Sequence, residues 1–542
     1  MKHGAWGILG LAVAATCWGA DNVNDAKFPL GPQLRVLAED AESPAYRELV
    51  GKMLLTDLAA EWQRVETVDN AESFLRAHGG LEHVASDPAL QGAYRRRLEI
   101  REKFLDVMRA GFARFKRTPP FDRGKQAEKA GTFQSDLKAA AVALSVVTSA
   151  PGAERQWARF RGPGGQGRTR AVGLPLEWDQ QRNVVWRREL SGQGNSSPVI
   201  WGNRIFLTSA QDKGLHREVV AIDRESGEVL WTRAFDSPQR DAMVRPKNGY
   251  ASATPVVDGE RLIAFLGSAG IVCLDLDGTV LWHHELPPFR ILHGPAASGV
   301  LYKDRVIFIQ DQSSADSIMI ALDKRTGKLL WQRSRTRAMG WSTPVVVRVG
   351  DHDELIYPGN RTVKGYDPRS GEELWSLGGP TREVVPSIVV GTDLIYSASG
   401  RNGPTLALRP GGRGDVTATH LAWRAVRGGP HVPSPVFYER RLYTVNDTGI
   451  ATCLDAESGK LVWQKRIRDR FSASPLEAEG RLYCASESGV VYVLATGEQF
   501  KVLAQNDLGS PILASPAALD GRLFIRTAEA LYSIADLDAA SR

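Results

Sequence analysis

Apolar and polar positions along the larger, C-terminal part of this chain repeat with a period too long for a single helix or strand. A glycine followed by apolar residues and a tryptophan returns at Gly227–Trp231, Gly278–Trp282, Gly327–Trp331, Gly371–Trp375 and Gly459–Trp463. Degenerate copies end at Trp186 and Trp423, so successive tryptophans are 40 to 51 residues apart. A period of about 40–50 residues built from short β-runs is typical of a propeller or another repeat array.

Each repeat contains four short apolar runs separated by turns. It opens on a small residue and a proline, as in Ser197-Pro198 or Thr254-Pro255, and proline is tolerated at the start of a strand. A second run follows a Gly- or Asp-containing turn, the third ends in an apolar residue and aspartate, and the tryptophan phrase is the fourth. Four antiparallel strands per repeat make one propeller blade.

Eight opening strands can be counted. They lie near residues 198, 255, 299, 344, 387, 435, 475 and 516, with Gly299 and Ser387 standing where the other copies have proline. The last repeat stops after Leu531–Ile534 without a fourth strand, whereas Asn183–Trp186 is a fourth strand with no blade before it. We therefore predict an all-β, eight-bladed β-propeller over residues 183–535, in which the N-terminal strand closes the last blade and leaves no free sheet edge.

The recurring tryptophans are expected to be structural. An indole in the outer strand can lie flat over the glycine of the next blade, where its large apolar surface stabilises the contact. The predicted docking residues are Trp186, Trp231, Trp282, Trp331, Trp375, Trp423 and Trp463.

The residues before the repeats differ in pattern. Residues 1–20 carry a basic start, an apolar run and a small-residue exit, which predicts a secretory signal peptide. Residues 21–150 are predicted to be an α-helical N-terminal region, with one helix starting at Asp87-Pro88 and shorter ones near 45–64 and 126–147. Residues 151–182, with the glycine-rich phrase Trp157–Gly165, are predicted to be a loop-rich linker.

The signal predicts a periplasmic or extracellular protein, because its apolar run is too short to span a bilayer and no later segment is apolar enough. The residues before Cys17, Ala14-Ala15-Thr16, match a lipidation site poorly, so we do not expect a lipid anchor there. The net charge is +6, but positive and negative residues are interleaved without a basic stripe, which argues against nucleic-acid binding. Cys273, Cys453 and Cys484 are expected to be small buried residues rather than ligands or disulfides.

The phrase Ala321–Trp331 resembles the tryptophan-docking motif of pyrroloquinoline-quinone (PQQ) propellers, and Ala221–Trp231, Tyr366–Trp375 and Cys453–Trp463 are close variants. The resemblance covers about residues 155–535. The segments Trp157–Gly164 and Gly192–Pro198 also resemble secreted "PQQ-binding-like" repeat proteins of planctomycete-type bacteria. The superfamily includes quinoprotein dehydrogenases and non-enzymatic BamB-like members, so the resemblance implies a fold more than an activity.

Two functions follow from this resemblance. We expect a non-enzymatic module that binds or scaffolds protein partners in the cell envelope, with the helical region as a second contact. The alternative is a PQQ-dependent quinoprotein that oxidises an alcohol or sugar, with PQQ and Ca²⁺ at the central funnel. The resemblance implies adjacent cysteines and acidic Ca²⁺ ligands in such an enzyme. This chain has no adjacent cysteines, no recognisable ligand motif and no His-Glu-x-x-His, so we name no catalytic or metal-binding residue.

A ligand, if one binds, should bind where the loops before the opening strands meet at the funnel mouth. These loops carry cationic, aromatic and amide side chains, with Glu383 the main carboxylate, and this mixture suits an anionic or quinone-like ligand better than a metal. The competing interpretation is that they are solvated loop tips. The candidate residues are Arg245, Asn248, Tyr250, His293, Trp341, Arg382, His431 and Arg470.

Overall fold

The computed structural model describes residues 143–537, except 149, 240, 242–247, 288–292, 313–315, 337, 401–402 and 426–427. These residues belong to the second of two compact units, Thr132–Arg542. The predicted signal peptide, nearly all of the predicted helical region and Arg245 lie outside the described residues.

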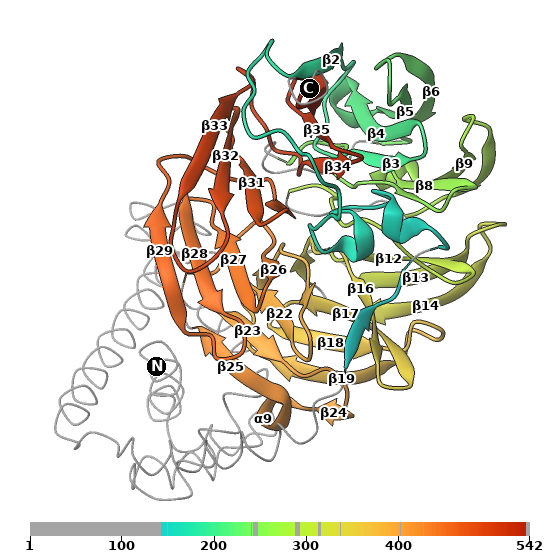
Figure 1. The fold of residues 1–542 in the computed structure, drawn as a ribbon. Helices are drawn as coiled ribbons and strands as arrows, with labels where there is room; N and C mark the ends of the chain where they lie inside the picture. Colours follow the sequence, from blue (N-terminus) through green and yellow to red (C-terminus); the bar gives the residue numbers. More distant parts are fainter. Residues whose placement is uncertain are drawn as a thin grey trace, which may run out of the picture. The chain divides into compact units, whose positions relative to one another are not determined.

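Eight small antiparallel sheets are arranged around a common axis, as predicted (Figure 1). We number them as blades 1 to 8 along the chain, and in each blade the first strand is innermost. Blade 1 consists of β3 (Val199–Trp201), β4 (Arg204–Gln211), β5 (His216–Asp223) and β6 (Val229–Asp236), and blade 2 of β7 (Val256–Val257), β8 (Arg261–Phe265), β9 (Ile271–Asp275) and β10 (Val280–His284). Blade 3 consists of β11 (Val300–Tyr302), β12 (Arg305–Gln310), β13 (Ser317–Asp323) and β14 (Leu329–Arg335). Blade 4 consists of β16 (Val345–Val349), β17 (His352–Gly359), β18 (Thr362–Tyr366) and β19 (Glu373–Gly378).

Blades 5 to 8 continue the ring. Blade 5 consists of β21 (Val389–Val390), β22 (Ile395–Ala398), β23 (Thr405–Leu408) and β25 (Leu421–Ala425), and blade 6 of β26 (Val436–Tyr438), β27 (Arg441–Val445), β28 (Ile450–Asp455) and β29 (Leu461–Arg466). Blade 7 consists of β30 (Leu476–Ala478), β31 (Arg481–Ala485), β32 (Val490–Ala495) and β33 (Val502–Asp507). Blade 8 consists of β34 (Ala517–Leu519), β35 (Arg522–Arg526) and β36 (Ala530–Ala535), and β2 (Val184–Glu189) completes it. Strand β2 pairs antiparallel with β36, from Val184↔Ile534 to Glu189↔Ala530, so the two ends of the ring share one sheet.

Most of the recurring tryptophans fasten neighbouring blades. A side chain built on Gly278 of blade 2 would lie 2.7 Å from the Trp231 ring of blade 1, and the Trp231 Nε1 donates to the carbonyl of Leu276 at 3.0 Å. Only a residue without Cβ allows this approach. The same indole–glycine contact joins Trp186 to Gly227, Trp282 to Gly327, Trp331 to Gly371 and Trp423 to Gly459, while Trp463 donates to the carbonyl of Gly497.

Trp375 departs from the predicted arrangement. It contacts Gly365 in the adjacent strand of its own blade, and its Nε1 donates to the buried carboxylate of Glu354 at 2.8 Å. The next blade has no docking glycine, because the insertion Arg409–His420 replaces its last turn. This insertion contains β24 (Gly414–Asp415), which pairs in parallel with the outer edge of β19, and the short helix α9 (Thr417–His420).

The segment before β2 is more than a linker. Strand β1 (Leu144–Val146) pairs with the inner edge of β16, and the 3-10 turns η2 (Ala153–Arg155) and η3 (Pro163–Gly165) follow near the axis of the ring (Figure 1). The predicted helix over 126–147 is therefore wrong at its C-terminal end. The run Leu144–Val147 forms ladder hydrogen bonds along the inner edge of β16, whose other edge pairs with β17, and these bonds outweigh the helical pattern.

The remaining short elements join loops. Strands β15 (Met339–Gly340) and β20 (Glu383–Val384) pair in parallel, and the 3-10 turns η4 (Asp212–Gly214) and η6 (Gly267–Ala269) lie between the second and third strands of blades 1 and 2. No helix among the described residues is long and apolar enough to cross a membrane.

Candidate functional site

A closed ring of hydroxyl groups surrounds the propeller axis at the start of the inner strands. The backbone N–H of each Ser or Thr that opens a blade donates to the side-chain oxygen of the corresponding residue in the next blade, at 2.9–3.3 Å, and the N–H of Ser515 closes the circle on Ser197 at 3.1 Å. The members are Ser197, Thr254, Ser298, Thr343, Ser387, Ser434, Ser474 and Ser515.

This hydroxyl ring explains why each repeat opens on Ser or Thr. The N–H groups are buried at the blade junctions, and a buried N–H without an acceptor is costly. The ring also corrects one register, because Ser387 was predicted in the proline position. It lies instead in the hydroxyl ring, and Ile388 occupies the place of the proline.

Residues 143–148 and 150–169 lie near the axis of the ring and form what we call the axial plug (Figure 1). The carbonyls of Trp157 and Ala158 accept hydrogen bonds from Ile200 of blade 1 and Val257 of blade 2, at 2.8 and 2.9 Å. The carbonyl of Gly167 accepts from Glu477 of blade 7 at 2.8 Å, and β1 pairs with blade 4. These partners lie in the inner strands, toward the turns that join each inner strand to the second strand of its blade. The axial plug therefore lies on that side of the ring.

The predicted mouth residues lie at the opposite side, in the loops before the inner strands. His293 and Trp341 pack together with ring centroids 5.4 Å apart, and Trp341 Nε1 and Asn248 Nδ2 donate to the same carbonyl, that of Gly294, at 3.0 and 3.4 Å. The structure therefore brings Asn248, His293 and Trp341 together, from the loops preceding blades 2, 3 and 4.

The other mouth candidates are less connected. His431 lies 3.6 Å from the carboxylate of Glu383, which is part of β20. Tyr250 is held by Arg217, whose guanidinium lies 5.2 Å from the ring centroid. Arg382 and Arg470 are exposed, and Arg470 approaches Glu487 at 3.7 Å.

The outer edges of the first three blades share an unusual surface. The two residues before the docking tryptophan are both apolar and exposed, whereas an alternating strand would hide one of them. Their exposed fractions are between 40% and 47% in blades 1 to 3. We call this set the apolar rim, and its members are Val229, Leu230, Val280, Leu281, Leu329 and Leu330.

The described residues contain neither of the two features that the resemblance implies for PQQ with Ca²⁺. The three cysteines among the described residues are free and buried, in β9, β28 and β31, and burial raises the pKa values of the Cys273, Cys453 and Cys484 thiols to about 12, 11 and 12. None can form a disulfide between neighbouring residues. Within the described part of the chain, no group of three His, Cys, Asp or Glu side chains could hold a metal ion.

Sequence comparisons agree with the fold. A family described as outer membrane protein assembly factor BamB matches residues 173–291, 216–407 and 359–500, which together span more than half of the chain. The chain belongs to this family. The BamB of Yersinia pestis is 26% identical over 329 residues, which cover 57% of this chain and 76% of that relative, and the BamB of Escherichia coli is 29% identical over 180 residues, covering 31% and 42%.

Quinoproteins are also among the similar proteins. The quinate/shikimate dehydrogenase (quinone) of Acinetobacter baylyi is 27% identical over 270 residues, which cover 34% of this chain and 32% of that enzyme. The crystal structure of quinohemoprotein alcohol dehydrogenase from Comamonas testosteroni superposes with a TM-score of 0.51 and 12% identity, over 75% of this chain and 83% of that one. At this identity the structural likeness concerns the fold alone.

Sequence reasoning missed the axial plug and the hydroxyl ring. The signal for the ring was present, because Ser or Thr precedes every opening strand, but it was interpreted only as a preference for small residues. The signal for the plug was the pair of arginines inside the glycine-rich phrase Trp157–Gly165, where a solvated loop would not need them.

Proposed function

We propose that this chain is an exported, non-enzymatic propeller that binds protein partners in the cell envelope as a scaffold. Membership of a family described as outer membrane protein assembly factors supports this, since that name denotes a role in assembly. We place the principal contact at the apolar rim of blades 1 to 3, because exposed apolar groups that recur on adjacent elements mark interaction sites.

The pairing at the outer edge of blade 4 indicates what kind of partner segment the rim would bind. The outer edge of blade 4 already accepts an added strand from within the chain, because β24 pairs with β19 through Trp375↔Gly414 and Ser376↔Asp415. Strands β6, β10 and β14 have no such addition among the described residues. An unpaired edge strand is a template for strand addition, so we propose that the rim binds an extended segment of a partner protein.

The mouth residues form a second proposed contact. Asn248, His293 and Trp341 present amide and aromatic groups together, and exposed Arg382 and Arg470 add positive charge. This composition suits a polar or anionic group of a partner better than a metal ion.

The alternative is a PQQ-dependent alcohol or sugar dehydrogenase, which the dehydrogenase relative favours. Purified protein mixed with PQQ and Ca²⁺ should neither take up the cofactor stoichiometrically nor reduce a dye over a panel of alcohols and aldoses. Stoichiometric uptake with turnover would overturn the scaffold proposal.

Rim and mouth can be compared directly in partner binding. The rim variant is Val229→Lys, Val280→Lys and Leu329→Lys together, and its control is Leu461→Lys, which stands at the same repeat position in blade 6 and is 59% exposed. The mouth variant is His293→Ala with Arg470→Ala. We expect the rim variant to lose a partner that crosslinks to the wild-type propeller, and the control to retain it.

Hydrogen exchange on the purified complex gives the decisive readout. Strand addition should slow exchange of backbone amides in β6, β10 or β14, and leave β19 unchanged because its edge is already paired. A complex that survives the rim variant and protects only the mouth loops would show that the rim is not the binding surface.

A further inference from the structure

Two arginines of the axial plug are buried without a carboxylate. Arg159 is 4% exposed and Arg161 is 1% exposed. The Arg159 Nη2 donates to the carbonyl of Pro344 at 2.9 Å, and the Arg161 Nη2 donates to the carbonyls of Pro435 and Gln166. All these acceptors are neutral. Three further buried nitrogens, Nε of Arg159 and Nε and Nη1 of Arg161, have no hydrogen-bond partner.

Two other buried arginines of the propeller are paired with carboxylates, whereas Arg526, which is 3% exposed, donates to neutral oxygens of Ser196 and Thr208. Arg217 Nη2 lies 2.5 Å from the carboxylate of Asp241, with both side chains fully buried, and Arg335 Nε lies 3.3 Å from that of Asp311. Taking a charge out of water costs several kcal/mol unless it is paired, so the paired arginines follow the expected pattern and the plug arginines do not. The plug therefore holds an excess of buried positive charge.

The lowered pKa values of the two plug arginines agree with this excess of buried positive charge. Burial lowers the pKa of Arg159 to about 10 and that of Arg161 to about 9, and the charge of Arg159 contributes to the lower pKa of Arg161. Both guanidinium groups are still charged at neutral pH, so neither escapes the cost of burial by losing its proton.

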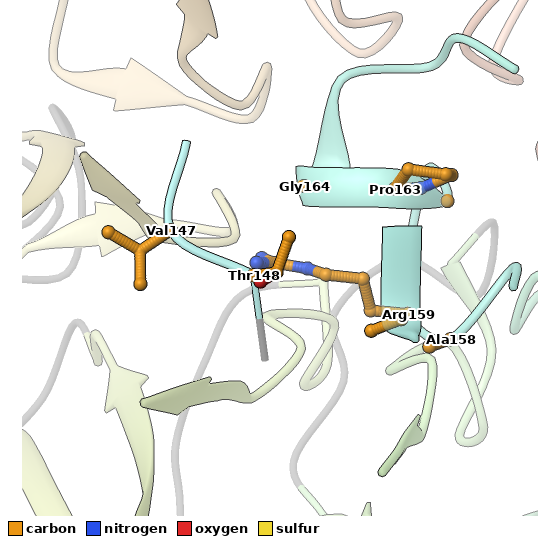
Figure 2. Close-up of a pocket in the computed structure, with 8 residues that line it drawn as sticks. Val147, Thr148, Ala158, Arg159, Pro163 and Gly164 are labelled. Atoms are coloured by element: carbon orange, nitrogen blue, oxygen red, sulfur yellow. The ribbon is translucent and has the colours of Figure 1, made fainter. Parts of the chain in front are cut away.

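A small cavity adjoins Arg159. It has a volume of about 10 Å³ and lies within the plug, lined among others by Val147 and Thr148 and by the turn Gly162–Gly164. Figure 2 shows Arg159 extending from the plug toward Thr148, with Pro163 and Gly164 nearby. A cavity of this size has room for a water molecule or a single small ion and none for phosphate or sulfate.

We propose that the axial plug binds a monatomic anion of the size of chloride beside Arg159, where it also offsets the charge of Arg161. Guanidinium N–H groups and a hydroxyl are suitable donors to such an ion, and charge-assisted hydrogen bonds are the strongest kind. Because the plug hydrogen-bonds blades 1, 2, 4 and 7, the anion stabilises the closed ring as well as the plug. This site is independent of the proposed partner binding.

Thermal unfolding tests the proposal, because an ion that binds only the folded state raises its stability. The full chain is melted in sodium chloride and in sodium gluconate at equal ionic strength. We expect the wild-type Tm to be higher in chloride by about 2 °C or more. Arg159→Gln and Arg161→Gln should abolish this difference. The control Arg413→Gln should keep it, because that exposed arginine donates only to the neighbouring carbonyl of Gly412.

General salt effects would appear in every variant, so an equal chloride dependence in wild type and Arg159→Gln would overturn the site. Crystals of the wild-type protein soaked in bromide provide a measurement that does not require a variant to fold. An anomalous peak in contact with Arg159 supports the proposal, and peaks only at the surface refute it.

Discussion

The perimeter and the axis of this propeller fasten the same eight sheets by different means. At the perimeter, indoles such as Trp231 lie against glycines such as Gly278, one blade to the next. At the axis, the hydroxyl ring passes through all eight blades and a single segment, the axial plug, hydrogen-bonds several of them at once. Each perimeter contact therefore joins only two neighbouring blades and recurs around the ring. The axial contacts link many blades at once, and those of the plug occur only once.

The strongest test of this difference replaces one tryptophan at each place. Trp157 of the plug is 1% exposed and Trp331 of the perimeter is 8% exposed. Trp157→Ala and Trp331→Ala should each lower the free energy of unfolding by about 3–5 kcal/mol, as for other buried tryptophans. Hydrogen exchange should separate them: loss of Trp157 should speed exchange in β3, β7 and β16 together, and loss of Trp331 only in blades 3 and 4. Equally local effects would contradict the cooperative role of the axis.

A smaller effect is expected from adding one methyl group under an indole. Gly227 has φ +73°, and a Cβ there would lie 2.6 Å from the Trp186 ring. Gly227→Ala should lower the free energy of unfolding by about 2–5 kcal/mol, from backbone strain and overpacking. Gly173 has the same φ of +73° with nothing within 4 Å, so Gly173→Ala isolates the backbone cost, about 1–2 kcal/mol. Equal losses in chemical denaturation would mean that the indole contact does not matter.

The hydroxyl ring should be less sensitive than the docking glycines. Ser474→Ala removes the acceptor of the buried Ser434 N–H, which lies 2.9 Å away, and should lower the free energy of unfolding by about 1–3 kcal/mol. Ser474→Thr keeps a hydroxyl, as at Thr254 and Thr343, and should be close to wild type in the same denaturation experiment. A threonine variant as unstable as the alanine variant would indicate that packing, rather than the hydrogen bond, holds the ring.

The smallest effect concerns pH at the turn between the two inner strands of blade 4, β16 and β17. Burial lowers the pKa of His352, but its hydrogen bonds with the carboxylates of Glu354 and Asp351 outweigh burial, and the net pKa is raised. A raised histidine pKa adds stability that is complete below the unfolded pKa and is lost as the pH rises through the folded value. His352→Gln should therefore cost under about 1 kcal/mol at mildly acidic pH and less at mildly alkaline pH.

The comparison for this histidine is His216→Gln. His216 pairs with the carboxylates of Asp212 and Asp236, whose side chains are 68% and 80% exposed. The side chain of Glu354, which pairs with His352, is fully buried. A pH-dependent loss of the same size in both variants, measured by urea denaturation across pH, would mean that the buried Glu354 is not its source.

Much of the perimeter could be predicted from the sequence, because each blade repeats the same phrase and each tryptophan needs only the next glycine. Trp375 was the exception, since the insertion Arg409–His420 removed the glycine that its position implied. At the candidate site, Asn248, His293 and Trp341 could be named as mouth residues from their place before opening strands. That two of them donate to one carbonyl, Gly294, could not be derived, because the contact joins loops of three blades.

The sequence by itself determined the number of blades and the closure of the ring, since the spacing of the tryptophans and the unpaired strands at Val184 and Leu531 leave one arrangement without a free edge. Only the tertiary structure decided that the axial plug hydrogen-bonds inner strands of several blades, that Ser387 belongs to the hydroxyl ring and that Arg159 and Arg161 are buried without a carboxylate partner. The physical reason is that a repeated sequence pattern reflects contacts that recur between successive repeats. A segment that occurs once, and meets partners hundreds of residues away, carries no such periodic signal.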